Sequence, residues 1–191
     1  MERSPVMKIA WCFASGTQID PAIEIEQIKK IGSSWGSWNT WRGCETENIV
    51  CYDLQKAVEL NKRALQAVTN LYVPENFYQK MNQPVGFKYY SGEFNENVDN
   101  IEDIVSMHLA ASSGNPVVLL LGYKFKISGV TDNPLALHKQ KNYHGMLRSV
   151  LNEYKDVQWV AVDIAEDDLD NAYSELTNFT CDTMETVLNL L

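Results

Sequence analysis

The sequence predicts an α/β fold: a three-layer, Rossmann-like domain with a five-stranded, mainly parallel sheet and helices on both faces. Apolar segments of strand length alternate with segments of helical periodicity along the 191 residues, and this alternation is typical of parallel strand-helix units. The most apolar segment, 117–121, contains no polar residue, as expected for a strand covered on both faces. A single domain, residues 1–191, is expected because a chain of this length can bury one core.

Five segments carry the strand pattern, because they are rich in apolar, aromatic and β-branched residues and end at turn-forming residues. They are residues 7–14, 48–53, 85–90, 116–123 and 157–164. Segment 85–90 alternates between two sets of side chains, which predicts a half-exposed strand at an edge. With the first and fourth segments in the centre, the favoured strand order is 3-2-1-4-5.

Helical spacing of apolar residues follows each of these strands. The expected helices cover residues 20–31, 54–68, 101–112, 134–154 and 169–191. Asp20-Pro21 and Asn133-Pro134 each supply an N-cap followed by a first-turn proline. Residues 70–84 are expected to form an irregular connection with at most one short turn of helix.

Composition and charge exclude several classes of function. The net charge of −9 argues against nonspecific nucleic-acid binding, which needs a basic face. The longest fully apolar run is far shorter than the roughly 20 residues of a membrane helix, and the first residues lack a signal-peptide core. We therefore expect a cytoplasmic protein without a membrane partner. The four cysteines are scattered and have no zinc-type spacing, so we expect no metal and no cofactor.

Positive charge is concentrated in one window of this acidic chain. Residues 122–148 contain five cations, Lys124, Lys126, Lys139, Lys141 and Arg148, and the single acid Asp132. An anionic ligand is expected to bind there, because a local excess of one charge attracts the opposite charge.

The predicted strand order places a ligand crevice between the loops that follow strands one and four. Ligands of open parallel sheets bind at this switch point, beyond the carboxyl ends of the strands. The expected ligand-binding residues are Ser15, Gly16, Thr17, Tyr123, Lys124, Lys126, Lys139, Lys141 and His144. The favoured function is binding of a small anionic ligand, a nucleotide or phosphorylated metabolite. An ordinary strand-helix turn remains an open alternative for 15–17, because one glycine makes neither a dinucleotide nor a P-loop motif.

Asp53 and Glu93 are the catalytic candidates, since each follows a predicted strand and an acid at this edge can act as a general base. A helix cap is the alternative role for Asp53. No nucleophile motif is present, so whether the protein is an enzyme stays open. In its strand-helix rhythm the sequence is similar to nucleotide-binding, TIR-like and deoxyribosyltransferase-like domains, but a shared superfold carries over no residue and no reaction.

Three tryptophans, Trp35, Trp38 and Trp41, stand three residues apart between Gly32 and Arg42. If the first helix continues past Gly32, their indoles belong to the core. If the segment is a loop, exposed indoles beside Arg42 form a binding surface for a base, a sugar or another protein. A third possibility is that residues 32–47 fold back and reach a pocket from the side. The second case motivates the alternative function, a protein-interaction or inhibitor module that uses this segment and the acidic surface. Its partner would be another protein or a second copy of this chain.

Overall fold

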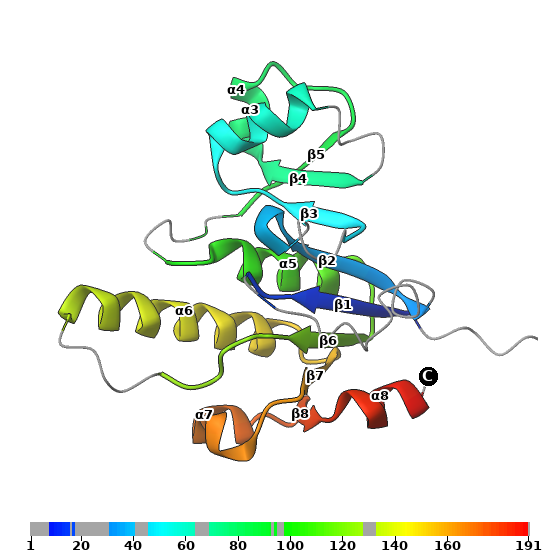
Figure 1. Cartoon of the computed structure of the whole chain (residues 1–191), viewed down its shortest axis with the longest axis vertical. Helices are drawn as coiled ribbons and strands as arrows, with labels where there is room; N and C mark the ends of the chain where they lie inside the picture. The colour runs from blue at the N-terminus through cyan, green and yellow to red at the C-terminus, as the bar shows by residue number, and fades with distance from the viewer. Residues whose placement is uncertain are drawn as a thin grey trace, which may run out of the picture.

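A computed structural model describes residues 8–15, 17, 31–40, 46–63, 69–92, 94, 98–127 and 133–190. In this part of the chain eight strands form one sheet in the order β5-β4-β3-β2-β1-β6-β7-β8, and all neighbouring strands are parallel. The strands are Ile9–Phe13 (β1), Ser33–Ser37 (β2), Asn48–Val50 (β3), Asn70–Pro74 (β4), Phe87–Tyr90 (β5), Val117–Leu121 (β6), Gln158–Val162 (β7) and Phe179–Asp182 (β8). Figure 1 shows them in this order along the longest axis.

Helices flank the sheet. They are Leu54–Lys62 (α3), Glu75–Lys80 (α4), Ile101–Ser112 (α5), Pro134–Glu153 (α6), the 3-10 helix Glu166–Asp168 (η2), Asn171–Ser174 (α7) and Met184–Leu190 (α8). The α/β class with a parallel, helix-flanked sheet is therefore confirmed, and the architecture is consistent with a Rossmann-like fold. The expected first helix lies outside the described residues except for its last residue, Ile31.

The predicted number of five strands is wrong. The five expected strands correspond to β1, β3, β5, β6 and β7, and they keep the predicted relative order within the sheet. The additional strands are β2, in the tryptophan segment, β4, in the expected irregular connection, and β8, inside the expected last helix. β2 reads SSWGS and β8 reads FTCD, so neither has the apolar run by which a buried strand is recognised.

The sheet has a hydrophobic core on each face. On one face Ile104 of α5 and Leu147 of α6 pack with Cys12 and Leu120, and the two helices contact each other. On the other face α8 packs on β1 and β6, and α3 and α4 pack on β3, β4 and β5. Figure 1 shows α5 and α6 beside the central strands, with α3 and α4 at one end of the molecule and α7 and α8 at the other.

The two ends of the sheet differ from its centre in exposure. β5 is an edge strand, as predicted, and its Tyr89 side chain is exposed. All five residues of β1 are buried, because β2 and β6 cover both of its sides and helices cover its faces. The central position of β1 places the loop after it at the switch point of the sheet.

Candidate functional site

A cavity of about 250 Å³ opens where the loops after β1 and β6 diverge. The chain runs from β1 outward to β5 and then crosses back to β6, so strand order reverses between β1 and β6. Four segments line the cavity: Ala14 and Ser15 after β1, Gly122, Lys124 and Lys126 after β6, Asp99, Asn100 and Asp103 at the start of α5, and Lys139, Gln140, Tyr143 and His144 of α6.

Five of the nine residues expected to bind a ligand line this cavity. They are Ser15, Lys124, Lys126, Lys139 and His144. Thr17, Tyr123 and Lys141 do not line it, and Gly16 lies outside the described residues. The fold therefore brings together residues of three segments that the sequence predicted to lie at one edge of the sheet. These residues are up to 129 positions apart in the chain.

Thr17 joins the ends of β1 and β6 instead of facing the cavity. Its Oγ1 donates to the carbonyl oxygen of Ala14 at 2.6 Å and lies 3.2 Å from that of Leu121. A Cβ at Gly122 would lie 2.2 Å from Thr17 Oγ1, and Gly122 has a φ of +73°. Only glycine fits this position, because the conformation is unfavourable for other residues and the space is taken.

Tyr123 and Lys141 were predicted as ligand contacts, and the structure gives them other surroundings. Tyr123 is buried, and its hydroxyl donates to the backbone oxygen of Asp103 at 3.0 Å, which ties the end of β6 to α5. Lys141 is exposed on α6 outside the cavity lining. The first supports the cavity wall, and the second belongs to the solvated face of the helix.

Asp103 is the acidic residue at the floor of the cavity, and it was not predicted. Its Oδ1 accepts hydrogen bonds from both the backbone N–H and the hydroxyl of Ser15, each at 2.7 Å. Ser15 Oγ also lies 3.0 Å from Ser37 Oγ, which accepts from the N–H of Thr40 at 3.2 Å. A chain of polar groups thus connects α5, the loop after β1 and the end of β2.

Burial raises the pKa of Asp103 to about 7, with a smaller contribution in the same direction from Glu102. The two hydrogen bonds from Ser15 oppose this shift. The carboxyl group therefore changes charge near neutral pH, which is common for groups at functional sites. Sequence offered one signal: Asp103 stands four residues before Met107 and seven before Ala110, on the buried side of the helix.

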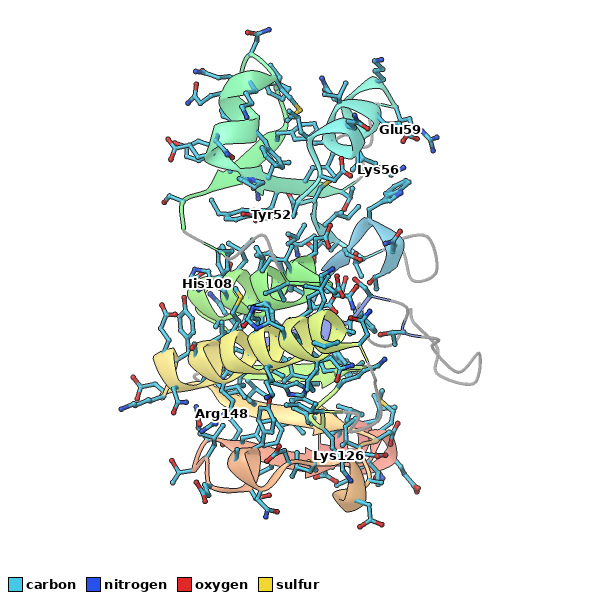
Figure 2. The ribbon with its side chains drawn as sticks, turned by 90° about the vertical axis from the view of Figure 1, so that its left-hand side faces the viewer. Tyr52, Lys56, Glu59, His108, Lys126 and Arg148 are labelled. Atoms are coloured by element: carbon cyan, nitrogen blue, oxygen red, sulfur yellow. The ribbon has the colours of Figure 1, made fainter. Side chains whose placement is uncertain are left out.

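The lysines of the cavity differ in their partners. Lys139 Nζ pairs with Asp99 at 2.8 Å, and Lys126 Nζ donates to the backbone oxygen of Asp167. Figure 2 shows the labelled Lys126 near η2 and α7, far from Lys56 and Glu59 on α3. Lys124 is exposed and forms no ion pair with a described residue. Its ammonium group is the one best placed to neutralise a ligand anion.

His144 forms the wall of the cavity next to Lys126. Its Nδ1 lies 2.7 Å from the hydroxyl of Tyr173. Burial lowers the pKa of His144, against opposing effects of Asp170 and a backbone hydrogen bond at Lys126. The imidazole is therefore neutral at pH 7, and it holds the loop after β6 against α6 and α7.

Of the two catalytic candidates, only Asp53 is among the described residues, and it does not line the cavity. Asp53 is exposed, and its Oδ1 accepts from the backbone N–H of Lys56 at 2.9 Å, so its carboxylate caps α3. This is the alternative that the sequence left open. Glu93 lies outside the described residues.

The tryptophan segment is an interior strand followed by a helical turn, so the predicted helix extension is wrong, although the burial in the core expected with it holds for Trp35 and Trp38. Trp35 in β2 is 3% exposed and Trp38 is 6% exposed. The Trp35 ring packs against Tyr72 with 5.2 Å between ring centroids. The expected exposed aromatic surface is thus wrong for these two residues, while Trp41 and Arg42 lie outside the described residues.

No described helix has the length and apolar character that crossing a membrane requires. The described residues contain no group of three or more His, Cys, Asp or Glu side chains able to hold a metal ion. Comparison of the chain with protein-family models, with curated proteins and with solved structures found no match. The chemistry of the cavity is therefore the basis for assigning a function.

Proposed function

We propose that this protein binds a small phosphorylated metabolite in the cavity between the loops after β1 and β6. The observation that carries the proposal is the convergence of Lys124, Lys126 and Lys139 on a cavity at the switch point of the sheet. Phosphate oxygens are suitable partners for lysine ammonium groups. A strand-end crevice at the switch point is where ligands of this architecture bind.

The cavity volume limits the size of the ligand. About 250 Å³ lies just below the range of roughly 300–1,000 Å³ typical of ligand pockets. A mononucleotide with one end in solvent or a smaller sugar phosphate suits this volume, and a dinucleotide does not.

Charge favours an anion at the mouth of the cavity. Lys139 shares its charge with Asp99, and Lys126 is held by a neutral carbonyl, so its charge is not offset there. Lys124 has no described acidic partner. The net charge of the chain is −9, so these lysines form a local region of positive charge on an acidic protein. A phosphate group can bind there.

The alternative function, protein interaction through exposed tryptophans, has no supporting observation among the described residues. Trp35 and Trp38 belong to the hydrophobic core. We therefore propose no second function.

Isothermal titration of the full chain with inorganic phosphate, ribose 5-phosphate, glucose 6-phosphate, AMP and GMP tests the proposal. We expect at least one of these probes to bind and to raise the melting temperature. Lys124→Ala should weaken that binding about tenfold, because a charge-assisted contact contributes about 1.5 kcal/mol or more. Lys141→Ala is the matched control: it removes an equal charge from the solvated face of α6 and should leave the affinity nearly unchanged.

Two results would contradict the proposal. The first is no binding by any of the five probes. The second is an equal loss of affinity in Lys124→Ala and Lys141→Ala, which would mean that the anion responds to overall charge and not to the cavity.

A further inference from the structure

One oxygen of the Asp103 carboxyl group is left for a ligand. The residue is 1% exposed, and both described hydrogen bonds of its side chain, from the N–H and the hydroxyl of Ser15, end on Oδ1. Oδ2 has no hydrogen-bond partner among the described residues. It is not fully sealed from solvent either. Asp103 lines the cavity, so the cavity is the space from which a ligand can reach this oxygen.

Among the described residues, no cation contributes to the pKa of Asp103. The one charged group that shifts its pKa, Glu102, is an acid, and Lys139 is paired with Asp99. Leaving a buried carboxylate oxygen without a donor is unfavourable. A ligand that presents a hydrogen-bond donor at this depth would remove that cost.

The same cavity therefore has two chemically different ends. Ammonium groups stand at its mouth, and a carboxylate oxygen held in place by Ser15 stands at its floor. A ligand amine would be repelled at the mouth by Lys124, Lys126 and Lys139, whereas a hydroxyl group carries no charge to repel. Above the pKa of Asp103, the donor that matches the Oδ2 carboxylate oxygen is an uncharged one, and a hydroxyl group is such a donor.

We propose that the ligand is a polyhydroxylated phosphate ester, a sugar phosphate or a nucleoside monophosphate, whose hydroxyl donates to Asp103 Oδ2 while its phosphate contacts the lysines. This inference rests on the proposed function and names the ligand class of the same site. Asp103 is then the residue that determines specificity. A site built to bind a hydroxyl rejects an analogue without it, because the buried acceptor is left unpaired.

The test compares sugar phosphates with methyl phosphate, a phosphate ester that has no hydroxyl for Asp103. Titration of the wild-type chain should show that ribose 5-phosphate or glucose 6-phosphate binds at least about tenfold more tightly than methyl phosphate. The titrations are made at about pH 8.5, above the pKa of Asp103, so that Oδ2 is a charged acceptor. Asp103→Asn keeps the size of the side chain and an acceptor for Ser15 but replaces this charged acceptor by a neutral amide, and it should reduce the preference while methyl phosphate binds as before. Lys124→Ala should weaken the binding of the sugar phosphates and of methyl phosphate by the same factor.

Asp156→Asn is the matched control, since Asp156 is exposed and lies outside the cavity lining. It should change neither the affinity for the sugar phosphates nor the affinity for methyl phosphate. Circular dichroism reports whether each variant is folded. If Asp103→Asn does not fold, the wild-type comparison alone decides the inference.

Each other outcome overturns a defined part of the proposal. Equal wild-type affinity for methyl phosphate and the sugar phosphates overturns the role of Asp103 and leaves the proposed function intact. An equal loss of affinity for all probes in Asp103→Asn shows a purely structural role and also overturns it. If no phosphate binds to the wild-type chain, the proposed function fails and this inference fails with it.

Discussion

At the scale of single residues, Asp103 shows how the surroundings of a side chain decide its chemistry. The residue stands in the first turn of α5, where a carboxylate is ordinarily stabilised by the helix dipole. Burial outweighs this effect and raises its pKa to about 7. Ser15 keeps the carboxyl group in one orientation, so its charge changes without loss of position.

The raised pKa predicts a pH dependence of stability. The folded chain holds the proton of Asp103 more tightly than the unfolded chain does. The stabilisation that this proton gives the folded chain is fully present below the unfolded pKa of 3.8 and is lost as pH rises through about 7. The free energy of unfolding of Asp103→Asn, measured relative to that of the wild type, should therefore rise by about 2 to 3 kcal/mol when the pH is raised from about 5 to about 8. Urea unfolding at both pH values measures the difference. A constant difference, like that expected for Asp156→Asn, would contradict the raised pKa.

Substituting three glycines by alanine separates two causes of lost stability, an unfavourable backbone conformation and steric overlap of the added Cβ. Gly122 and Gly114 both have positive φ, but an added Cβ overlaps Thr17 at Gly122 and meets nothing within 4 Å at Gly114. Gly114→Ala should cost about 1 kcal/mol, and Gly122→Ala should cost clearly more. Gly145→Ala, in open space on α6, should stabilise by about 0.5–1 kcal/mol. Denaturant midpoints of the three variants test this ranking, and equal losses at Gly122 and Gly114 would contradict it.

At the scale of elements, β2 is the segment whose sequence is least like its structure. Its serines and glycine are not typical of a buried strand, yet it lies between β1 and β3 with four of its five residues buried. Ser34 and Asn48 supply side-chain hydrogen bonds next to it: Ser34 Oγ accepts from the N–H of Glu47, and Asn48 donates to the Ser34 carbonyl. These contacts satisfy polar groups that would otherwise make burial unfavourable.

The interior position of β2 predicts a large effect of truncating Trp35. Trp35→Ala should reduce the free energy of unfolding by about 3–5 kcal/mol, because a buried ring is replaced by a cavity. Val58→Ala is the control, since Val58 is 37% exposed on α3, and it should change stability by no more than about 0.5 kcal/mol. Urea unfolding followed by far-UV circular dichroism measures both. A loss below about 1 kcal/mol for Trp35→Ala would place this indole at the surface.

The N-cap of α6 is the element boundary that sequence predicted well. Asn133 accepts hydrogen bonds from the N–H groups of Leu135 and Ala136 at 3.0 Å and 3.4 Å, and Pro134 follows it. The signal is local, so it could be read without the fold. By contrast, Asn100 before α5 has a left-handed backbone, and its side chain makes no capping hydrogen bond.

At the scale of the whole molecule, the local charge of the cavity and the net charge of the chain act on a phosphate ligand with opposite signs. The net charge of −9 repels an anion, and the lysines of the cavity attract it. Which of them dominates depends on distance, because salt screens charges beyond about 10 Å at 0.1 M ionic strength.

Contact with the lysines predicts that phosphate binding weakens with salt. Raising the ionic strength from about 0.05 M to about 0.5 M should increase the dissociation constant of a bound probe. The dependence should be shallower in Lys124→Ala, whereas Lys141→Ala should behave as wild type. Affinity that increases with salt would show that the net charge dominates and would contradict direct contact with the lysines.

Much of the fold could be predicted because it depends on local patterns. Apolar periodicity identified five strands and their relative order, and the position of the switch point followed from that order. The clustered lysines then indicated one edge of the sheet. β4 and β8 were missed because they are short strands beside turn residues, where sequence signals for strand and loop overlap.

Local sequence patterns were enough to predict the α/β class, the positions of β1 and β6 in the sheet, and the loops that carry Ser15 and Lys124. Only the tertiary structure decided that the tryptophan segment is a buried strand and that Asp103 forms the floor of the cavity. The physical reason is the range of the interactions. Periodicity and capping act within a few residues, whereas β2 is a strand because of its neighbours, and the Asp103 carboxyl group is held by Ser15, 88 positions away in the chain.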